Sequence, residues 1–412
     1  MSSPWVPEMA GKLFDNTWII AAIWIGMALA ASLISIKIGI TVALVEVFMG
    51  ILAGNFLGIQ ETTEWIDFLA VMGSMSIAFL AGAELDPQSF KRNLKPSIIL
   101  GVLSFLLPFL GVWVFTQHVL GWDFHQSQIA GIALSTTSVA VVYAAIVDKG
   151  LSDTKFGKLV LSVCFVTDLG SVFLLSVLFV PFNLYMLLLL AAIALAIFVA
   201  PPLVRFTIRK LGTNKVSEPV IKLLLLILFL LAGLAFAAGI EAVLPAFVFG
   251  IIVAGVFVKD KVLINRIRTL VFTVFTPFLF IKAGLLISVN AAIASLGLIA
   301  IFLLLKVILK TAAIFPASRA FKIPAKMSGY SSLLMSTGIA FGTIAAMYGF
   351  NHQIIDQTQY TVLVTVVILS AIIPALIAQV AFEPSLEEAQ SWGKVQEKNT
   401  VLEKPDPPED CA

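Results

Sequence analysis

Long apolar stretches separated by short polar links cover most of the chain. A helix needs roughly 20 apolar residues to cross a bilayer, and thirteen stretches are close to that length. The predicted spans are residues 17–36, 38–58, 65–85, 97–120, 128–147, 157–180, 183–204, 219–239, 242–258, 267–288, 291–315, 327–349 and 357–381. The pattern therefore predicts an all-α polytopic membrane protein with 13 transmembrane helices.

Composition supports this fold class. Of the 412 residues, 60% are hydrophobic and 12% are charged, and the mean hydropathy is +1.04. These values exclude a soluble globular protein. The net charge of +2 gives no indication of nucleic-acid binding, and two cysteines do not make a disulfide framework or a transition-metal site.

The charges in the links predict the orientation. Links after even-numbered spans contain no Lys or Arg and carry acids instead, namely Glu61, Glu64, Asp123, Glu241 and Asp356. Links after odd-numbered spans carry the basic residues Lys37, Lys91, Arg92, Lys95, Lys149, Lys155, Lys158, Arg205, Arg209, Lys210, Lys215, Lys259, Lys261, Arg266, Arg268, Arg319, Lys322 and Lys326. Because basic loops stay in the cytoplasm, we expect the N-terminus outside and the C-terminus inside.

Both ends of the chain are polar. The first residues lack the basic region and cleavage site of a signal peptide, so we expect the first span to be retained. Residues 383–412 are polar and acidic and end in a proline cluster, which predicts a disordered cytoplasmic tail. This tail is too short for a nucleotide-binding domain.

One acid, Asp168, lies in the middle of the apolar run LSVCFVTDLGSVFLL. A carboxylate at that depth costs at least about 3 kcal/mol on insertion scales, and intramembrane acids are generally functional. The alternative is a structural acid paired with a membrane lysine. The position favours a site for a cation or a proton.

Two pairs of segments repeat at nearly one offset. LST at 134–136 matches MST at 335–337, and FLAGAELD at 79–86 resembles FIKAGLLIS at 280–288. The offset of about 200 residues corresponds to seven spans. An odd number of spans gives the two copies opposite topology, which is typical of secondary transporters with inverted repeats and broken helices.

The fifth and twelfth spans are the predicted discontinuous helices. Hydroxyl side chains compete for backbone hydrogen bonds, and exposed carbonyls are tolerated at membrane depth only where they face protein or a water-filled cavity. Such oxygens are hard ligands for a cation, although small residues also serve helix packing. The hydroxyls of these spans include Ser135, Thr136, Thr137, Ser138, Ser336 and Thr337.

Three lysines also fall within predicted spans. Lys306 and Lys310 are one turn apart on one face of span 11, so either could be a counter-ion for Asp168 or extend to the interface. Lys282 falls in a predicted break at FIKAG, with Asp168, Glu241 or a carbonyl as its possible partner. Two further acids, Glu46 and Glu241, could be ion-path or interfacial residues, and for Glu241 the interfacial role is favoured.

Several segments resemble the membrane domain of monovalent cation:proton antiporters, and the similarity is greatest to the NapA- and Kef-type branch. It covers about residues 17–380 and includes LSTTSVAVVYAAIVDKG, FGKLVLSVCFVTDLGSVFLL, TPFLFIKAGLLI and KTAAIFPASRAFKIPAKMSGYSSLLMSTGIAFG. The resemblance implies an NhaA/NapA-like fold with two crossing broken helices, a homodimer in a bacterial inner membrane, and no cofactor. It further implies a moving core at about 97–180 and 291–381, and a dimer panel at about 17–85 and 219–288.

The resemblance also implies roles for individual residues. Asp168 matches the residue that carries the cation and the proton, Thr136 and Thr137 match hydroxyls near the ion, and Lys310 matches the membrane lysine, with Lys306 as fallback. Thr167 and Ser138 complete the predicted ion site. Many relatives have two adjacent aspartates where this chain has Thr167 and Asp168, which implies electroneutral exchange, and where relatives often carry an acid in span 12 this chain has Ile339.

The function predicted from these features is exchange of Na⁺ or K⁺ for protons at Asp168 by an elevator mechanism. A gated cation channel and an organic-anion:sodium symporter of related fold are the alternatives. An enzyme is not expected, because His118, His125 and His352 fall in outer loops or at a span end and form no catalytic or metal constellation within a span.

Overall fold

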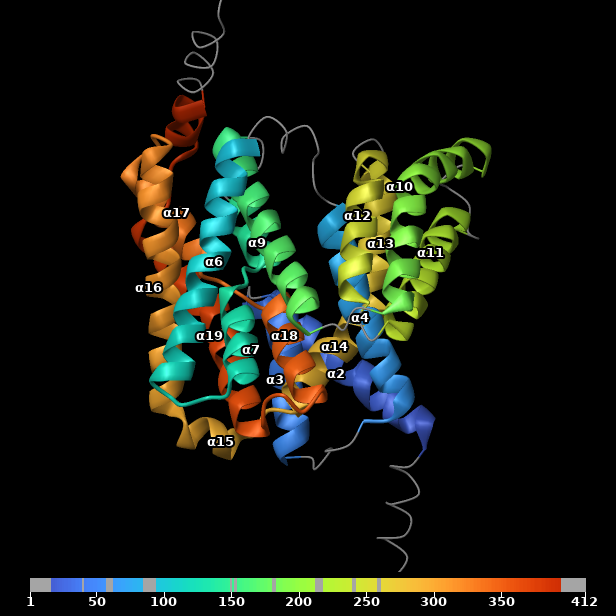
Figure 1. Cartoon of the computed structure of the whole chain (residues 1–412), viewed down its shortest axis with the longest axis horizontal. Coiled ribbons are helices and arrows are strands. Elements are labelled where there is room, and N and C mark those ends of the chain that lie inside the picture. Colours follow the sequence, from blue (N-terminus) through green and yellow to red (C-terminus); the bar gives the residue numbers. More distant parts are fainter. Residues whose placement is uncertain are drawn as a thin grey trace, which may run out of the picture. The chain divides into compact units, whose positions relative to one another are not determined.

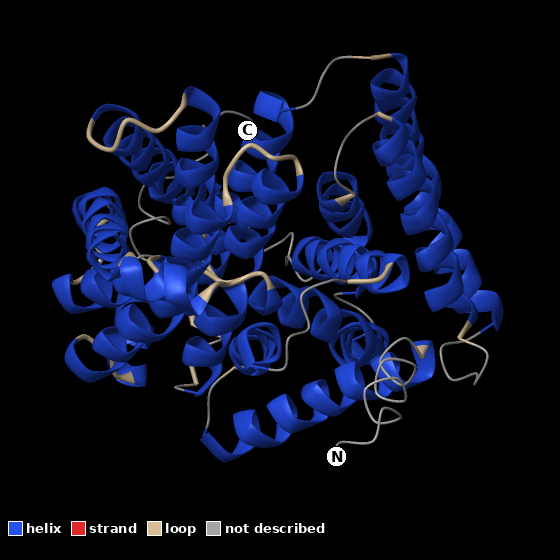
Figure 2. Ribbon diagram, turned by 90° about the horizontal axis from the view of Figure 1, so that it is seen from below, coloured by secondary structure: helices blue, strands red, loops and turns tan. Residues whose placement is uncertain are grey.

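Every regular element in the described part of the chain is a helix (Figure 2). The computed structural model describes residues 16–38, 41–56, 62–83, 94–148, 150–151, 154–179, 183–211, 218–238, 242–257 and 261–393. Seven charges discussed above, namely Glu61, Lys91, Arg92, Lys149, Lys215, Glu241 and Lys259, lie outside these residues.

The helices follow one another through the chain with short links (Figure 1). They are α2 (Thr17–Ile38), α3 (Val42–Phe56), α4 (Glu64–Ala83), α6 (Leu94–His118), α7 (Phe124–Ser135), α8 (Val139–Asp148), α9 (Lys155–Phe179), α10 (Leu184–Leu211), α11 (Pro219–Ala237), α12 (Val243–Phe257), α13 (Lys261–Leu270), the π-helical turn η1 (Val271–Phe275), α14 (Thr276–Leu285), α15 (Val289–Ala294), α16 (Leu296–Ala320), α17 (Ala325–Met335), α18 (Ala340–Asn351) and α19 (Gln357–Ala381).

The helix lengths agree with a membrane protein. Ten helical stretches of the described chain are long and apolar enough to span a bilayer, whereas α3 and α12 have 15 residues each. Helices occupy all thirteen predicted ranges. The number of complete crossings is not established by these lengths, so thirteen remains a prediction.

The chain divides into two compact units. Unit 1 comprises Met1–Asp86, Val172–Ile301 and Gly342–Ile368, and unit 2 comprises Pro87–Ser171, Phe302–Phe341 and Leu369–Ala412. The predicted dimer panel falls in unit 1. The predicted core is shared, because residues 172–180, 291–301 and 342–368 of it belong to unit 1.

Close helix contacts at small residues hold unit 1 together. A Cβ atom on Gly82 of α4 would collide with the carbonyl of Phe247 in α12, and one on Gly284 of α14 would collide with the carbonyl of Val47 in α3. Such contacts let helices pack without a hydrophobic driving force. The two glycines that mark the internal sequence echo are therefore both at tight helix crossings.

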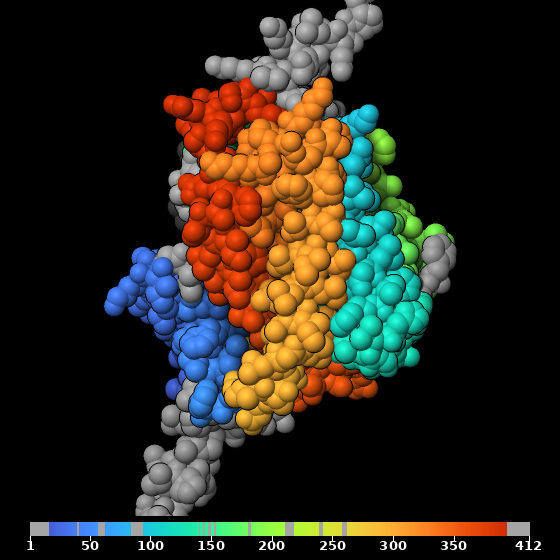
Figure 3. Space-filling model, turned by 90° about the vertical axis from the view of Figure 1, so that its left-hand side faces the viewer, coloured from blue at the N-terminus to red at the C-terminus, as the bar shows by residue number. Residues whose placement is uncertain are grey.

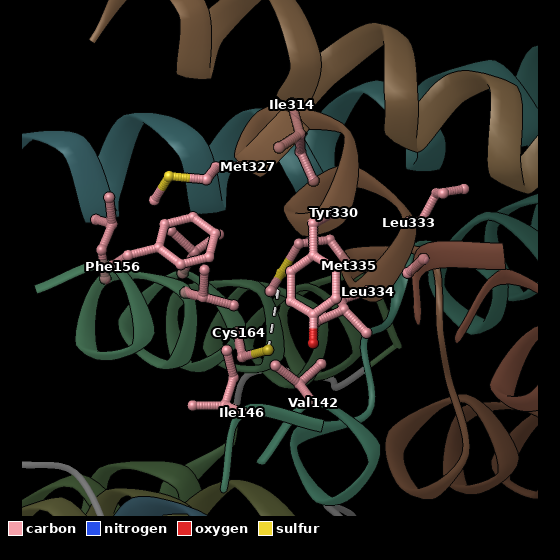
Figure 4. Packing of buried hydrophobic residues seen from close by; sticks show 14 of the residues in the cluster. Val142, Ile146, Phe156, Cys164, Ile314, Met327, Tyr330, Leu333, Leu334 and Met335 are labelled. Atoms are coloured by element: carbon pink, nitrogen blue, oxygen red, sulfur yellow. Dashed lines mark hydrogen bonds between the residues drawn. The ribbon is translucent and has the colours of Figure 1, made fainter. Parts of the chain in front are cut away.

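A cluster of buried apolar side chains forms the core of unit 2 (Figure 4). It packs α9 against α17, with Phe156 and Tyr330 in contact and the Cys164 thiol 3.7 Å from the Met335 sulfur. This cluster holds α9, which carries Asp168, against α17, which ends at Met335.

The α16 helix has an apolar outer face and a charged inner face. Ile301, Leu304 and Ile308 are exposed, whereas Lys306 and Lys310 are fully buried. Figure 3 shows α16 as an orange band on the surface between the cyan α6 and red C-terminal residues. This distribution suits a helix with lipid on one side and polar protein groups on the other.

Residues 386–393 form a helix where the sequence predicted disorder (dark red in Figure 1). Ala389 is fully buried in the core cluster of unit 2. The Trp392 indole donates a hydrogen bond of 3.0 Å to the carbonyl of Lys322 and meets the Phe156 ring edge to face. The sequence did not reveal this helix because its composition is polar. Two residues, Ala389 and Trp392, supply most of its apolar contacts.

An exposed ion pair joins this short helix to α17. The Lys326 ammonium lies 3.1 Å from a carboxylate oxygen of Glu388. The backbone N–H of Ser385 and then the Lys326 side chain hold the pKa of the Glu388 carboxyl below its usual value. A carboxyl group whose pKa is lower in the folded than in the unfolded protein stabilises the folded state at pH values above its unfolded pKa. This stabilisation is lost as the pH falls through the folded pKa. The contribution of this ion pair is therefore lost on acidification.

The C-terminal helix gives the first testable prediction. We expect Trp392→Ala to release residues 386–393, because the indole supplies both the hydrogen bond to Lys322 and the ring contact with Phe156. Hydrogen exchange measured by mass spectrometry should be faster in residues 386–393 and 322–326. Trp18→Ala, at a side chain that is 83% exposed, is the matched control. Unchanged exchange at 386–393 in the Trp392 variant would contradict the docking.

Candidate ion-binding site

Two helices of unit 2 are interrupted where the sequence predicted breaks. The helix α7 ends at Ser135, Thr136 is extended with φ −66° and ψ 160°, and α8 begins at Val139. The helix α17 ends at Met335 and α18 begins at Ala340. Helix ends therefore lie within both segments where the sequence predicted a break.

Hydroxyl side chains account for both interruptions. The hydroxyls of Ser135 and Thr136 donate to the carbonyls of Ile132 and Ala133, at 2.8 and 3.0 Å. In the second segment, Ser336 and Thr337 donate to Ser332 and Leu334 at 2.8 and 2.7 Å. Helix C-termini leave carbonyls without backbone partners, and these hydroxyls satisfy some of them.

The two interruptions meet. The Thr137 hydroxyl donates a hydrogen bond of 3.0 Å to the carbonyl of Met335, the last residue of α17. A Cβ atom built on Gly338 would lie 3.1 Å from the Thr136 hydroxyl oxygen. Residues of the two interruptions are therefore in contact, and polar backbone groups of both lie at one place inside unit 2.

Asp168 on α9 lies beside this crossing. Its side chain is 1% exposed, and its Oδ1 has no hydrogen-bond partner in the described part of the chain. The backbone amide of Thr137 hydrogen bonds to the carboxyl group, and Lys310 is near enough for its charge to act on it. A buried acceptor without a partner is rare in proteins and calls for an explanation. Binding a cation or a proton is such an explanation.

The neighbouring Thr167 has a different environment. It is fully buried, and its hydroxyl donates to the carbonyl of Val163 at 3.0 Å and lies 3.4 Å from the carbonyl of Gly101 on α6. Ser138 caps α8, because its hydroxyl accepts from the amide of Val141 at 3.4 Å. Both hydroxyls therefore make hydrogen bonds with the helices around the site, and their place among the ion ligands stays a prediction.

The two lysines of α16 approach different interruptions. The Lys310 ammonium donates to the hydroxyls of Ser104 and Thr137, at 3.1 and 3.0 Å, on the α7–α8 side. The Lys306 ammonium donates to Ser370 of α19 at 3.0 Å and lies against Gly338 on the α17–α18 side. Both side chains are fully buried, so neither extends to the membrane interface.

Lys282 has a partner that sequence reasoning missed. Its ammonium lies 2.7 Å from a carboxylate oxygen of Asp67 on α4, so the three suggested partners are replaced by this one. The FIKAG motif is also continuous helix within α14, contrary to the predicted break, and the irregular turn is η1 just before it. Glu46, on α3, is also buried.

The chemistry of the crossing favours a small cation. Four hydroxyls donate their hydrogens to backbone carbonyls, namely those of Ser135, Thr136, Ser336 and Thr337. Toward a further ligand each can therefore act only as an acceptor, through its oxygen lone pairs. Oxygen lone pairs and one carboxylate are ligands for hard cations. Sequence reasoning missed Ser104, Ser370 and the carbonyl of Met335, because single polar groups in apolar helices give no pattern.

Most of the chain matches a known family of membrane proteins. The family model described as "Sodium/hydrogen exchanger, transmembrane" matches residues 24–382. The chain is 26% identical to a probable Na⁺/H⁺ antiporter 3 of Methanocaldococcus jannaschii, over 81% of this chain and 88% of that protein. It is also 26% identical to the Na⁺/H⁺-K⁺ antiporter GerN of Bacillus cereus, over 87% of this chain and 94% of that protein.

Solved structures are similar in fold. The sodium proton antiporter MjNhaP1 from Methanocaldococcus jannaschii, solved at pH 8, aligns with a TM-score of 0.66 and covers 94% of this chain. The alignment takes in 100% of that structure at 16% sequence identity. At this identity the likeness concerns the fold alone.

The hydroxyl of Thr137 generates the second prediction. We expect Thr137→Val to lower the stability by about 1–3 kcal/mol, because Lys310 and the terminal carbonyl of Met335 both lose a buried partner. Thermal unfolding in detergent measures the loss. Thr116→Val is the matched control, since that hydroxyl donates only to carbonyls of its own helix, at Val112 and Trp113. Equal melting temperatures for the two variants would contradict a linking role.

Proposed function

The chain belongs to the sodium/hydrogen exchanger family, and on that premise we propose that it exchanges Na⁺ or K⁺ for protons with Asp168 as the shared site. The family establishes a transporter of the cation/proton antiport class that is not an enzyme. The observation that carries the proposal for Asp168 is its buried, unpartnered carboxylate oxygen beside two interrupted helices.

Competition at one carboxylate explains coupling. Transfer of an unpaired charge into a buried site is costly, so Asp168 is favoured when it holds either a proton or a cation. The two ligands use the same oxygens and exclude each other. If the site is exposed alternately to the two sides only when it is occupied, cation and proton must move in opposite directions.

The oxygens around the crossing supply the remaining ligands. The backbone amide of Thr137 hydrogen bonds to the carboxyl group, Thr136 precedes it in the α7–α8 interruption, and Ser336 and Thr337 belong to the α17–α18 interruption. Na⁺ and K⁺ both accept hydroxyl and carbonyl oxygens. The name of GerN includes both ions, which supports keeping both as candidate substrates here.

The rest of the proposal concerns movement and assembly. Two compact units are what a rigid-body elevator movement requires. The single intramembrane aspartate after Thr167 agrees with electroneutral exchange of one cation for one proton. We further propose a homodimer in a bacterial inner membrane with a cytoplasmic C-terminus, which rests on the family resemblance and on the distribution of basic links.

Replacement of the carboxylate tests the proposed site. We expect Asp168→Asn to abolish exchange, because the amide cannot take up a proton and provides no negative charge for a cation. The measurement is recovery of a pH-sensitive dye in proteoliposomes when Na⁺, K⁺ or another alkali cation is added.

Asp356→Asn is the control for this change. That residue is exposed and caps α19, and asparagine caps a helix equally well. The control variant should exchange ions at the rate of the unchanged protein. Cation-dependent proton flux that persists in folded Asp168→Asn protein would refute the assignment.

Removal of the Lys310 charge should change the pH dependence of exchange. We expect Lys310→Met to move the pH profile of exchange toward alkaline values, because the nearby positive charge favours the ionised carboxylate that binds the cation. Exchange rates in the same vesicles at a series of pH values provide the measurement. Lys95→Met, at an exposed lysine of α6, is the control, and superimposable profiles for all three proteins would make Lys310 purely structural.

A further inference from the structure

The two buried lysines of α16 have different roles. We propose that Lys306 is a positioning residue, which holds the α17–α18 interruption against Thr136, whereas Lys310 belongs to the ion site itself. This inference rests on the proposed function, since its effect is on the binding of the transported cation.

The position of Lys306 supports this role. Its ammonium is fully buried and donates a hydrogen bond of 3.0 Å to Ser370 on α19. A Cβ atom on Gly338 would lie only 2.6 Å from the Lys306 nitrogen, closer than side-chain packing allows. The ammonium therefore lies against the backbone at Gly338, and a side chain at that position would displace it.

The charge of Lys306 suits the helix end it reaches. The helix α17 ends at Met335, three residues before Gly338. The C-terminal end of a helix carries partial negative charge and is stabilised by a cation. Lys310 gives the same support to the other interruption, because it donates to the hydroxyl of Thr137, two residues after the end of α7. One turn of α16 thus provides one ammonium group for each interruption.

The contacts of the two ammonium groups separate the two lysines. Lys310 donates to Thr137, whose backbone amide hydrogen bonds to Asp168, while Lys306 donates to Ser370 of α19. What Lys306 does share with the ion site is Gly338, where a Cβ atom would lie 3.1 Å from the Thr136 hydroxyl and 3.4 Å from the Thr136 carbonyl oxygen. Displacement of Lys306 should therefore disturb Thr136, a proposed cation ligand.

The test is a double-mutant cycle between Lys306 and Gly338. Lys306→Gln removes the ammonium, and Gly338→Ala pushes it aside while leaving its charge in the protein. We expect each variant to raise the apparent KM for the cation about tenfold, which lies within the range of coupling energies between neighbouring residues. The double variant should raise it no further, because both changes remove one contact.

Two matched variants control for the chemistry of the changes. Gly297→Ala is in the same helix α16, where a Cβ atom meets nothing within 4 Å, and Lys95→Gln removes an exposed lysine charge. Both should leave the KM unchanged. If Lys306→Gln does not fold, Gly338→Ala against Gly297→Ala still decides, and an unchanged KM in Gly338→Ala overturns the proposal.

The outcomes separate this inference from the proposed function. Effects of Lys306→Gln and Gly338→Ala that multiply in the double variant would overturn the positioning role, even if Asp168→Asn is inactive. Exchange that persists in Asp168→Asn would overturn the ion site, whatever the cycle shows. A lower maximal rate with an unchanged KM in both single variants also overturns the positioning role.

Discussion

Unit 2 depends on one constraint. Backbone groups that lose their helical hydrogen-bond partners inside an apolar environment must find other partners. No water is available in the hydrocarbon region, so a break in a helix is tolerated only where protein groups satisfy it. Here the two breaks are in contact. Hydroxyl side chains hydrogen bond there to the carbonyl of Met335 and to the buried ammonium groups of Lys306 and Lys310. The same oxygens that would be a cost in a packed core are the ones we propose as cation ligands beside Asp168.

Sequence patterns located the helices and the two interruptions well, for physical reasons. Apolar runs of membrane length allow few alternatives, and the clusters at Ser135–Ser138 and Ser336–Gly338 compete with helical hydrogen bonds in a recognisable way. Asp168, Lys306 and Lys310 were found because a charge in an apolar span is costly. These features are local in the chain, so they can be read without a structure.

Pairings between distant residues could not be read in this way. Asp67 is the partner of Lys282 across 215 positions, and Ser104 is a partner of Lys310 across 206. Each belongs to a helix whose other residues give no hint of the contact. The helix at 386–393 was not predicted for a different reason. Its composition is polar, although two apolar residues in it pack against the core of unit 2.

The two-faced surface of α16 has a consequence for biosynthesis. Lys310 finds Ser104 and Thr137 already synthesised when α16 emerges, whereas the partner of Lys306 is Ser370, which follows 64 residues later. A charged lysine at the middle of a nascent helix costs roughly 2.5–3.5 kcal/mol on translocon scales. The hydrogen-bond partner of Lys306 therefore becomes available only after α19 has been translated, and until then α16 has a lysine without that partner.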